Sequence, residues 1–162
     1  MNTVQTFTFF GKITDRDDFD LLKHAIQTSV HLHQEPTEHL IDAATTGKPI
    51  SIMGGNRERL SSLAEACEEA GLAYHITELD EGNIALRREC WQPGAGRAFH
   101  VELTREGEPA YTSEQIRDAI QAAGNSRIIE TLQRWAHADR PVRFEIDPDL
   151  IEELRQERSP KL

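Results

Sequence analysis

The sequence predicts an α+β protein, in which strands and helices are mixed along one chain. Two hydrophobic spacings carry this prediction. Residues Val4 to Ile13 alternate with period two, as in a half-buried strand, whereas Phe19, Leu22 and Ile26 recur at helical spacing. Turn and capping residues separate such runs along the chain. With 162 residues and 38% hydrophobic content, the chain can form a core without disulfides or metals.

The first eighty residues predict the order strand, helix, helix, strand, helix, strand. The first helix follows an acidic cluster that suits a helix N-terminus, and Pro36 separates it from the second helix. Gly47 and Gly71 end the second and third helices. The expected elements are a strand at 4–13, a helix at about 17–32, a short helix ending at Thr46, a strand at 50–53, a helix capped by Asn56, and a strand at 72–77.

The second half begins with a predicted hairpin. Its strands run from 84 to 91 and from 98 to 104, around a loop at 92–96 that is rich in glycine and proline. Thr112 followed by Gln115 forms a capping box that starts a helix. The remaining expected elements are a helix capped by Asn125 or Ser126, a strand through Val142, Phe144 and Ile146, and a terminal helix opened by Asp147-Pro148.

A turn signal at Gly82-Asn83 marks the best internal boundary of the chain. We therefore expect one α+β unit at 1–80, a second α+β unit at 81–157, and a frayed tail at 158–162. The hydrophobic pattern leaves open whether the two units have separate cores or form one continuous domain.

Three segments of the first half carry a resemblance to a known family. They are Asp-Phe-Asp-Leu-Leu-Lys at 18–23, Leu-Ile-Asp-Ala-Ala-Thr-Thr-Gly-Lys-Pro at 40–49, and the stretch at 59–76 that contains Leu-Ala-Glu-Ala-Cys-Glu-Glu-Ala-Gly. In order and spacing they resemble the C-terminal domain of the bacterial ribosomal stalk protein, whose fold the Clp-protease adaptor shares. The resemblance covers a little over a third of the chain. It implies a fold, and a tendency to bind other proteins and not to catalyse.

The sequence departs from that family in the second-helix region. The stalk proteins are rich in lysine and glycine there and dock translation factors, whereas this chain has Glu35-Pro36-Thr37-Glu38-His39, with no lysine. The charge that attracts a translation factor is absent. We therefore do not expect that activity here.

Composition excludes several classes of protein. Asp and Glu number 28 against 18 Lys and Arg, a net charge of −10, which disfavours binding to duplex nucleic acid. No apolar run is long enough to span a membrane, and the N-terminus lacks the pattern of a secretory signal. Two cysteines cannot form a disulfide framework or a cysteine-rich zinc site. We expect a soluble cytoplasmic protein without membrane contact.

The hairpin at 84–104 is a candidate partner-binding site. Arg88, Trp91 and Arg97 gather around it in an otherwise acidic chain, and Trp and Arg are enriched at interface hot spots. The acidic helix start provides a second candidate, and its partner-binding residues would be Glu35, Glu38 and His39.

Other candidate sites have weaker patterns. The turn Gly54, Gly55, Asn56, Arg57 follows a strand and opens a helix, the geometry of a phosphate site, but it lacks the P-loop lysine. His31, His33 and His39 lie close together without a metal-binding spacing, so no metal is predicted. Cys90 lies near two arginines, which lower a thiol pKa, yet its strand face favours burial. No cofactor is predicted.

These observations favour a non-enzymatic, acidic protein-binding protein. It would act as an inhibitor of the immunity-protein or antitoxin type, as a nucleic-acid mimic, or as an adaptor, with another protein, a basic one in the inhibitor case, as its partner. One alternative is a regulatory domain that binds a small ligand or phosphate at the 54–57 turn. Another is an enzyme whose site is assembled from residues distant in sequence.

Overall fold

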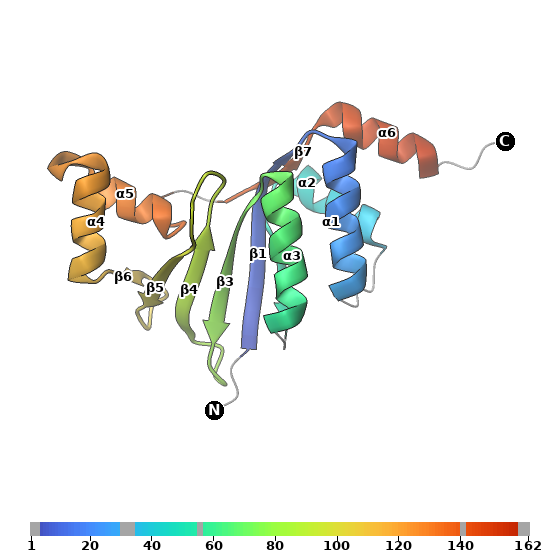
Figure 1. Ribbon diagram of the computed structural model, residues 1–162. Helices are drawn as coiled ribbons and strands as arrows, with labels where there is room; N and C mark the ends of the chain where they lie inside the picture. Colours follow the sequence, from blue (N-terminus) through green and yellow to red (C-terminus); the bar gives the residue numbers. More distant parts are fainter. Residues whose placement is uncertain (1–3, 30–34, 55–56, 140–141, 159–162) are drawn as a thin grey trace.

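The computed structural model describes residues 4–29, 35–54, 57–139 and 142–158 and has an α+β fold (Figure 1), as predicted. Its sheet has the strand order β2-β1-β3-β4-β5-β6, and β7 pairs with β1 outside this series. The elements are β1 (Val4–Ile13), α1 (Arg16–Ser29), α2 (Pro36–Thr46), β2 (Ile50–Gly54), α3 (Arg57–Ala70), β3 (Ala73–Leu79), β4 (Ala85–Trp91), β5 (Phe99–Leu103), β6 (Pro109–Ala110), α4 (Ser113–Ala123), the 3₁₀ turn η1 (Asn125–Arg127), α5 (Ile128–Trp135), β7 (Phe144–Ile146) and α6 (Pro148–Arg158).

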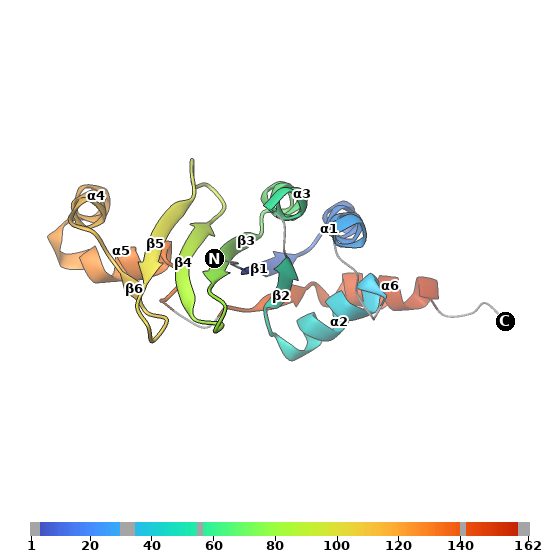
Figure 2. The ribbon, with the colours of Figure 1, turned by 90° about the horizontal axis from the view of Figure 1, so that it is seen from below.

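The first half has the predicted order of elements, with β1 at its centre. Both β2 and β3 pair antiparallel with β1, one on each side, and α3 connects them. Figure 2 shows α1 and α3 side by side over one face of the sheet. Phe7 and Phe9 of β1 are fully buried beneath them, as their period-two spacing predicts.

The ends of the first two helices follow from local chemistry. Helix α1 is described as far as Ser29, and the predicted continuation to Leu32 lies outside the described residues. Glu35 caps α2 by accepting a hydrogen bond from the backbone N–H of Glu38, and Pro36 occupies the first turn, where its missing N–H costs nothing. Gly47 ends α2 with φ 70°, a conformation that glycine adopts without strain.

The second half extends the same sheet and adds a pair of helices at its far end (Figure 1). Strand β4 pairs with β3, and β5 pairs with β4. The predicted capping box of Thr112 and Gln115 is present at the start of α4. The predicted cap of the next helix is wrong: Asn125 and Ser126 lie inside η1, and no side chain caps α5. The chain leaves α4 in a tight 3₁₀ turn, in which the backbone N–H of Arg127 donates to the carbonyl of Gly124 at 3.4 Å.

One sheet and one core cross the boundary near residue 80. Besides the β3–β4 pairing, β7 pairs parallel with the end of β1, where Gly11 has φ 123°. Phe144 meets Phe9 edge-on at a ring distance of 5.6 Å, and belongs to the same buried cluster. Arg158, expected in a frayed tail, is the last residue of α6 and forms ion pairs with α2, whereas residues 159–162 lie outside the described residues.

The two faces of the sheet are covered by different helices. Tyr74 points to the side of α3, since its hydroxyl donates to Glu68 at 3.2 Å. Its neighbour His75 points to the opposite side and meets His137, just after α5. We call these sides the α3 face and the α5 face. No helix among the described residues is long and apolar enough to cross a membrane.

Candidate protein-binding surface

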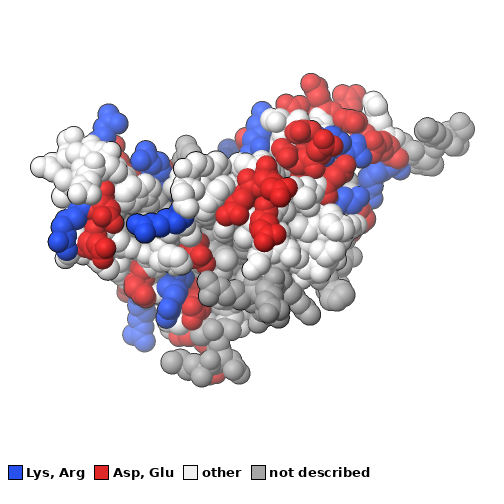
Figure 3. All heavy atoms as spheres, viewed as in Figure 1, with Lys and Arg blue, Asp and Glu red and all other residues white. Residues whose placement is uncertain are grey.

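Unbalanced negative charge gathers on the helices of the α3 face. Figure 3 shows carboxylates over the upper part of α3 and at the junction of α1 and α6. Glu65, Glu68 and Glu69 are exposed in the C-terminal half of α3, and that helix has no basic residue in its last turn. Negative charge at a helix C-terminus opposes the helix dipole. These glutamates therefore do not stabilise the helix that carries them.

A shallow groove of about 230 Å³ lies between α1 and α3 beside these glutamates. Glu65 and Glu69 form part of its lining, and neither forms an ion pair with any described residue. The apolar part of the lining consists of Leu21, Ala25 and Ala66. The groove thus combines an apolar wall, the imidazole of His24 and two carboxylates that form no ion pair with any described residue.

The N-terminus of α1 adds further carboxylates. Asp15, Asp17 and Asp18 follow one another closely, and Asp15 accepts a hydrogen bond from the backbone N–H of Asp17 at 3.1 Å. Desolvation, together with repulsion from Asp15 and Asp17, raises the pKa of Asp18. These carboxylates lie at the N-terminus of α1, where the helix dipole favours negative charge.

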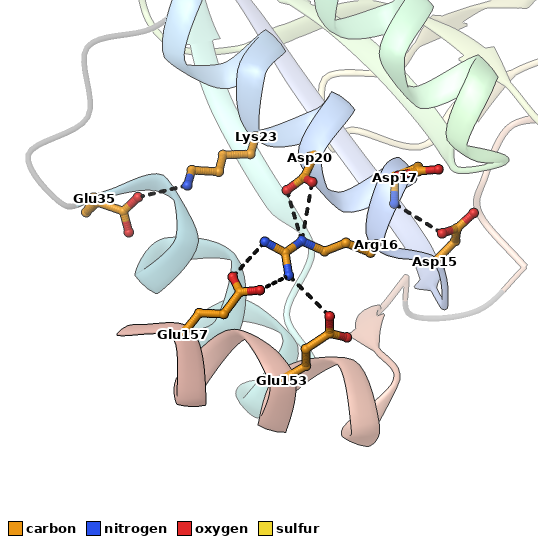
Figure 4. Close-up of polar contacts among 8 residues, drawn as sticks. All are labelled: Asp15, Arg16, Asp17, Asp20, Lys23, Glu35, Glu153 and Glu157. Carbon is orange, nitrogen blue, oxygen red and sulfur yellow. Dashed lines mark hydrogen bonds and ion pairs between the residues drawn. The ribbon is translucent and has the colours of Figure 1, made fainter. Parts of the chain in front are cut away.

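Arg16 is the main cation in this region, and three carboxylates surround it (Figure 4). Its guanidinium forms two hydrogen bonds of 2.7 Å to Glu157, and lies 3.2 Å from Asp20 and 3.4 Å from Glu153. The hydrogen bond from Arg16 lowers the pKa of the Glu157 carboxyl. The cluster joins α1 to α6 and still leaves an excess of negative charge.

The predicted partner-binding residues Glu35 and Glu38 are exposed but form ion pairs with cations of the protein itself. Glu35 lies 3.6 Å from Lys23 of α1 (Figure 4) and 3.4 Å from Arg158 of α6, and Glu38 lies 2.8 Å from Arg158. Burial raises the pKa of the Glu35 carboxyl, but hydrogen bonds from Thr37 and Glu38 together lower it by more, so the net shift is downward. These two glutamates link α1, α2 and α6 by exposed ion pairs, in addition to their apolar packing.

The predicted hairpin cluster is not one surface. Trp91 is half-buried on the α3 face, where it stacks on Tyr74 at a ring distance of 5.6 Å. Arg88 points to the α5 face, where its guanidinium donates to the backbone oxygen of Ala136 at 3.1 Å. The two are three residues apart on β4, and side chains an odd number of residues apart lie on opposite faces of a strand. Arg97 is exposed in the loop beyond them.

The remaining predicted residues give no further site. Gly54 ends β2 and Arg57 begins α3, but Gly55 and Asn56 between them lie outside the described residues, so a phosphate site there stays a prediction. His39 is half-buried in α2, whereas His31 and His33 lie outside the described residues. Within the described part of the chain, no three His, Cys, Asp or Glu residues are placed to hold a metal ion.

The cysteines are buried, as their hydrophobic spacing predicts. Cys67 belongs to the core under α3, and Cys90 is 2% exposed on the α5 face of β4. Burial raises the pKa of the Cys90 thiol to about 12, despite the positive charge of Arg88. Burial also raises the pKa of the Cys67 thiol, so both thiols are protonated at neutral pH.

A buried histidine pair on the α5 face escaped prediction. The Nδ1 atoms of His75 and His137 are 3.2 Å apart, although the residues are 62 positions apart in sequence, and Phe10 meets His137 edge-on. Burial, then the nearby charge of Arg88, lower the pKa of His75 to about 3 and of His137 to about 4. No sequence signal could have found this pair, because His75 occupies a strand position that reads as solvent-facing until α5 is known to cover it.

Comparison of the chain with known protein families, with curated proteins and with solved structures finds no match. Function is therefore inferred from the residues of these surfaces.

Proposed function

We propose that the protein is a non-enzymatic, cytoplasmic protein-binding protein whose α3 face binds a basic partner. The observation that carries this proposal is the groove between α1 and α3, where Glu65 and Glu69 lie beside an apolar wall and pair with no cation of the described part of the chain. A lysine or arginine side chain fits this combination, since its methylene stem packs on apolar surface while its head meets a carboxylate.

The charge of the whole chain supports the same kind of partner. Residues 1–80 carry 13 Asp and Glu against 6 Lys and Arg, so the excess negative charge lies mainly on the half that forms the groove. Complementary charge accelerates the encounter of two proteins, and this acceleration falls as ionic strength rises. An inhibitor of a basic protein, or a protein that mimics nucleic acid, would use such a surface.

The test is a tagged pull-down from the lysate of the native host with three versions of the protein. They are the wild type, the double variant E65Q/E69Q, and the control E106Q/E108Q, which removes the same charge from the exposed turn between β5 and β6. We expect one protein to be retained in stoichiometric amount by the wild type and the control, and at least about tenfold less by E65Q/E69Q. Equal retention by all three versions, or no retained protein, would contradict the proposal.

Glutamine substitutions at Glu65 and Glu69 keep the shape of the groove and remove only its charge. Substitutions at Glu35 or Glu38 would be a poorer test, because these residues pair with Lys23 and Arg158 and their loss would disturb the helix packing. A circular dichroism spectrum and a Tm measurement on each variant test whether the fold is retained.

A further inference from the structure

A second hollow lies at the other end of the sheet, between the β4–β5 hairpin and the α4–α5 pair. It has a volume of about 260 Å³. Its apolar part is formed by Cys90, Phe99 and Trp135, with two alanines of the hairpin loop. Arg97, Asp118 and Gln92 complete the lining. This hollow shares no lining residue with the α1–α3 groove and lies beyond the edge of the acidic helices.

The floor of the hollow is an aromatic surface backed by a neutral thiol. The rings of Phe99 and Trp135 lie 5.6 Å apart at an angle of 53°, one from β5 and one from α5. Cys90 is almost fully buried between these elements. A flat or branched apolar group packs favourably on such a floor, since aromatic side chains contribute large contact area with little loss of rotamer freedom.

The hollow also carries two opposite charges from different elements. Arg97 belongs to the hairpin loop and Asp118 to α4, and both are exposed. Neither forms an ion pair with any described residue. Gln92 is held in place, since its amide nitrogen donates to the backbone oxygen of Arg134 at 2.8 Å, and its amide oxygen is left to accept a hydrogen bond.

From this arrangement we infer that the hollow binds a small hydrophobic α-amino acid. Arg97 meets the ligand carboxylate, Asp118 meets its ammonium group, and the ligand side chain packs on Phe99 and Trp135. This inference is independent of the basic partner proposed for the α3 face.

Other classes of small molecule use fewer of these features. A fatty acid or aromatic acid would leave Asp118 without a cation, and an apolar amine would leave Arg97 without an anion. A nucleotide is too large, because the volume lies below the range of about 300–1,000 Å³ of typical ligand pockets. An α-amino acid has both charges and an apolar body within that size.

Tryptophan fluorescence gives a direct readout of binding. The chain has two tryptophans, and Trp91 lies on the α3 face, so the variant W91F leaves Trp135 as the one fluorophore of this kind. We would titrate W91F with L-phenylalanine and L-leucine and measure the emission of Trp135. The Tm of the wild-type protein with and without each amino acid gives the same answer without any substitution.

Two analogues of phenylalanine separate the two charges. Phenylalaninamide lacks the carboxylate, and 3-phenylpropionate lacks the ammonium group. We expect R97Q to weaken phenylalanine binding at least tenfold and to leave phenylalaninamide binding unchanged. We expect D118N to weaken phenylalanine binding at least tenfold and to leave 3-phenylpropionate binding unchanged. The control variants R105Q and E114Q, exposed charges outside the lining, should bind phenylalanine as the wild type does.

The inference is overturned by either of two results. One is the absence of any change in Trp135 emission and in wild-type Tm up to about 10 mM amino acid. This concentration would saturate a site with a Kd of about 1 mM or lower. The other is saturable binding that R97Q and D118N leave unchanged, which would place the amino acid elsewhere on the protein.

Discussion

His75 and His137 form a neutral pair in which one ring nitrogen donates a hydrogen bond to the other. Both side chains are buried, and Arg88 contributes a positive charge beside them. A protonated imidazole would lose its hydration there and would meet a like charge, so the pair is stable only while both rings are neutral. The Nε2 atom of His137 is also buried and has no hydrogen-bond partner among the described residues.

This pair makes stability depend on pH. The pKa values of about 3 for His75 and about 4 for His137 lie below the ordinary value of 6.5, so between these limits the unfolded chain binds more protons than the folded one. We therefore expect the contribution of the two histidines to the free energy of unfolding to be complete above pH 6.5 and to fall as the pH is lowered towards 4. Each histidine contributes a slope of up to about 1.4 kcal/mol per pH unit.

Urea unfolding of the wild type and of the double variant H75Q/H137Q at a series of pH values measures this slope. Glutamine does not titrate, so the variant should show a flatter dependence between pH 6.5 and 4, while the carboxylates of both proteins titrate alike. Parallel curves for the two proteins would show that the histidines do not carry the dependence.

At the scale of the elements, the C-terminal end of α5 is anchored to β4. Arg88 of β4 donates to the backbone oxygen of Ala136, and Gln92, just after β4, donates to that of Arg134, which also accepts a hydrogen bond from the backbone N–H of His137 at 3.2 Å. A cation at a helix C-terminus also suits the helix dipole. His137, the residue after the C-cap of α5, has φ 57°. This left-handed conformation is usually adopted by glycine at the end of a helix.

Two substitutions at His137 should therefore differ in a defined way. Both H137G and H137A lose the contact with His75, but glycine adopts the left-handed conformation freely, whereas alanine keeps the strain. We expect H137A to be less stable than H137G by about 1 kcal/mol, measured by urea unfolding at pH 7. Equal stabilities, or a more stable H137A, would show that the backbone of the variant no longer has a positive φ.

At the scale of the whole molecule, the late strand β7 and helix α6 complete the core of the first half. Phe144 and Ile146 pair with the end of β1, and Leu150 and Leu154 are buried in the same cluster. Residues from both sides of the predicted boundary therefore bury one another's apolar surface. Such a chain is expected to unfold as a single cooperative unit.

Truncation of Phe144 tests this cooperativity. F144A removes a fully buried ring that meets Phe9, so we expect a loss of about 3–5 kcal/mol from the free energy of unfolding. The loss should appear equally in far-UV circular dichroism and, in the W91F background, in the fluorescence of Trp135, which lies at the far end of the sheet. Two separated transitions would show that the halves unfold independently.

The extent of prediction differs between elements and site. The bounds of β1, the end of α2 at Thr46 before Gly47, the capping box of Thr112 and the opening of α6 at Pro148 agree with the structure, because each depends on residues within a few positions of one another. The partner-binding residues are harder to predict from the sequence, because the packing of the helices decides whether a glutamate faces a partner or another helix.

Local spacing and capping by themselves determined which segments of this protein form strands and which form helices, since hydrophobic period and turn chemistry act over a few residues. Tertiary structure alone decided that β7 pairs with β1, that Arg88 meets the end of α5, and that His75 meets His137. The physical reason is distance along the chain. Contacts between residues far apart in sequence depend on how the layers assemble, and no short stretch of sequence contains that information.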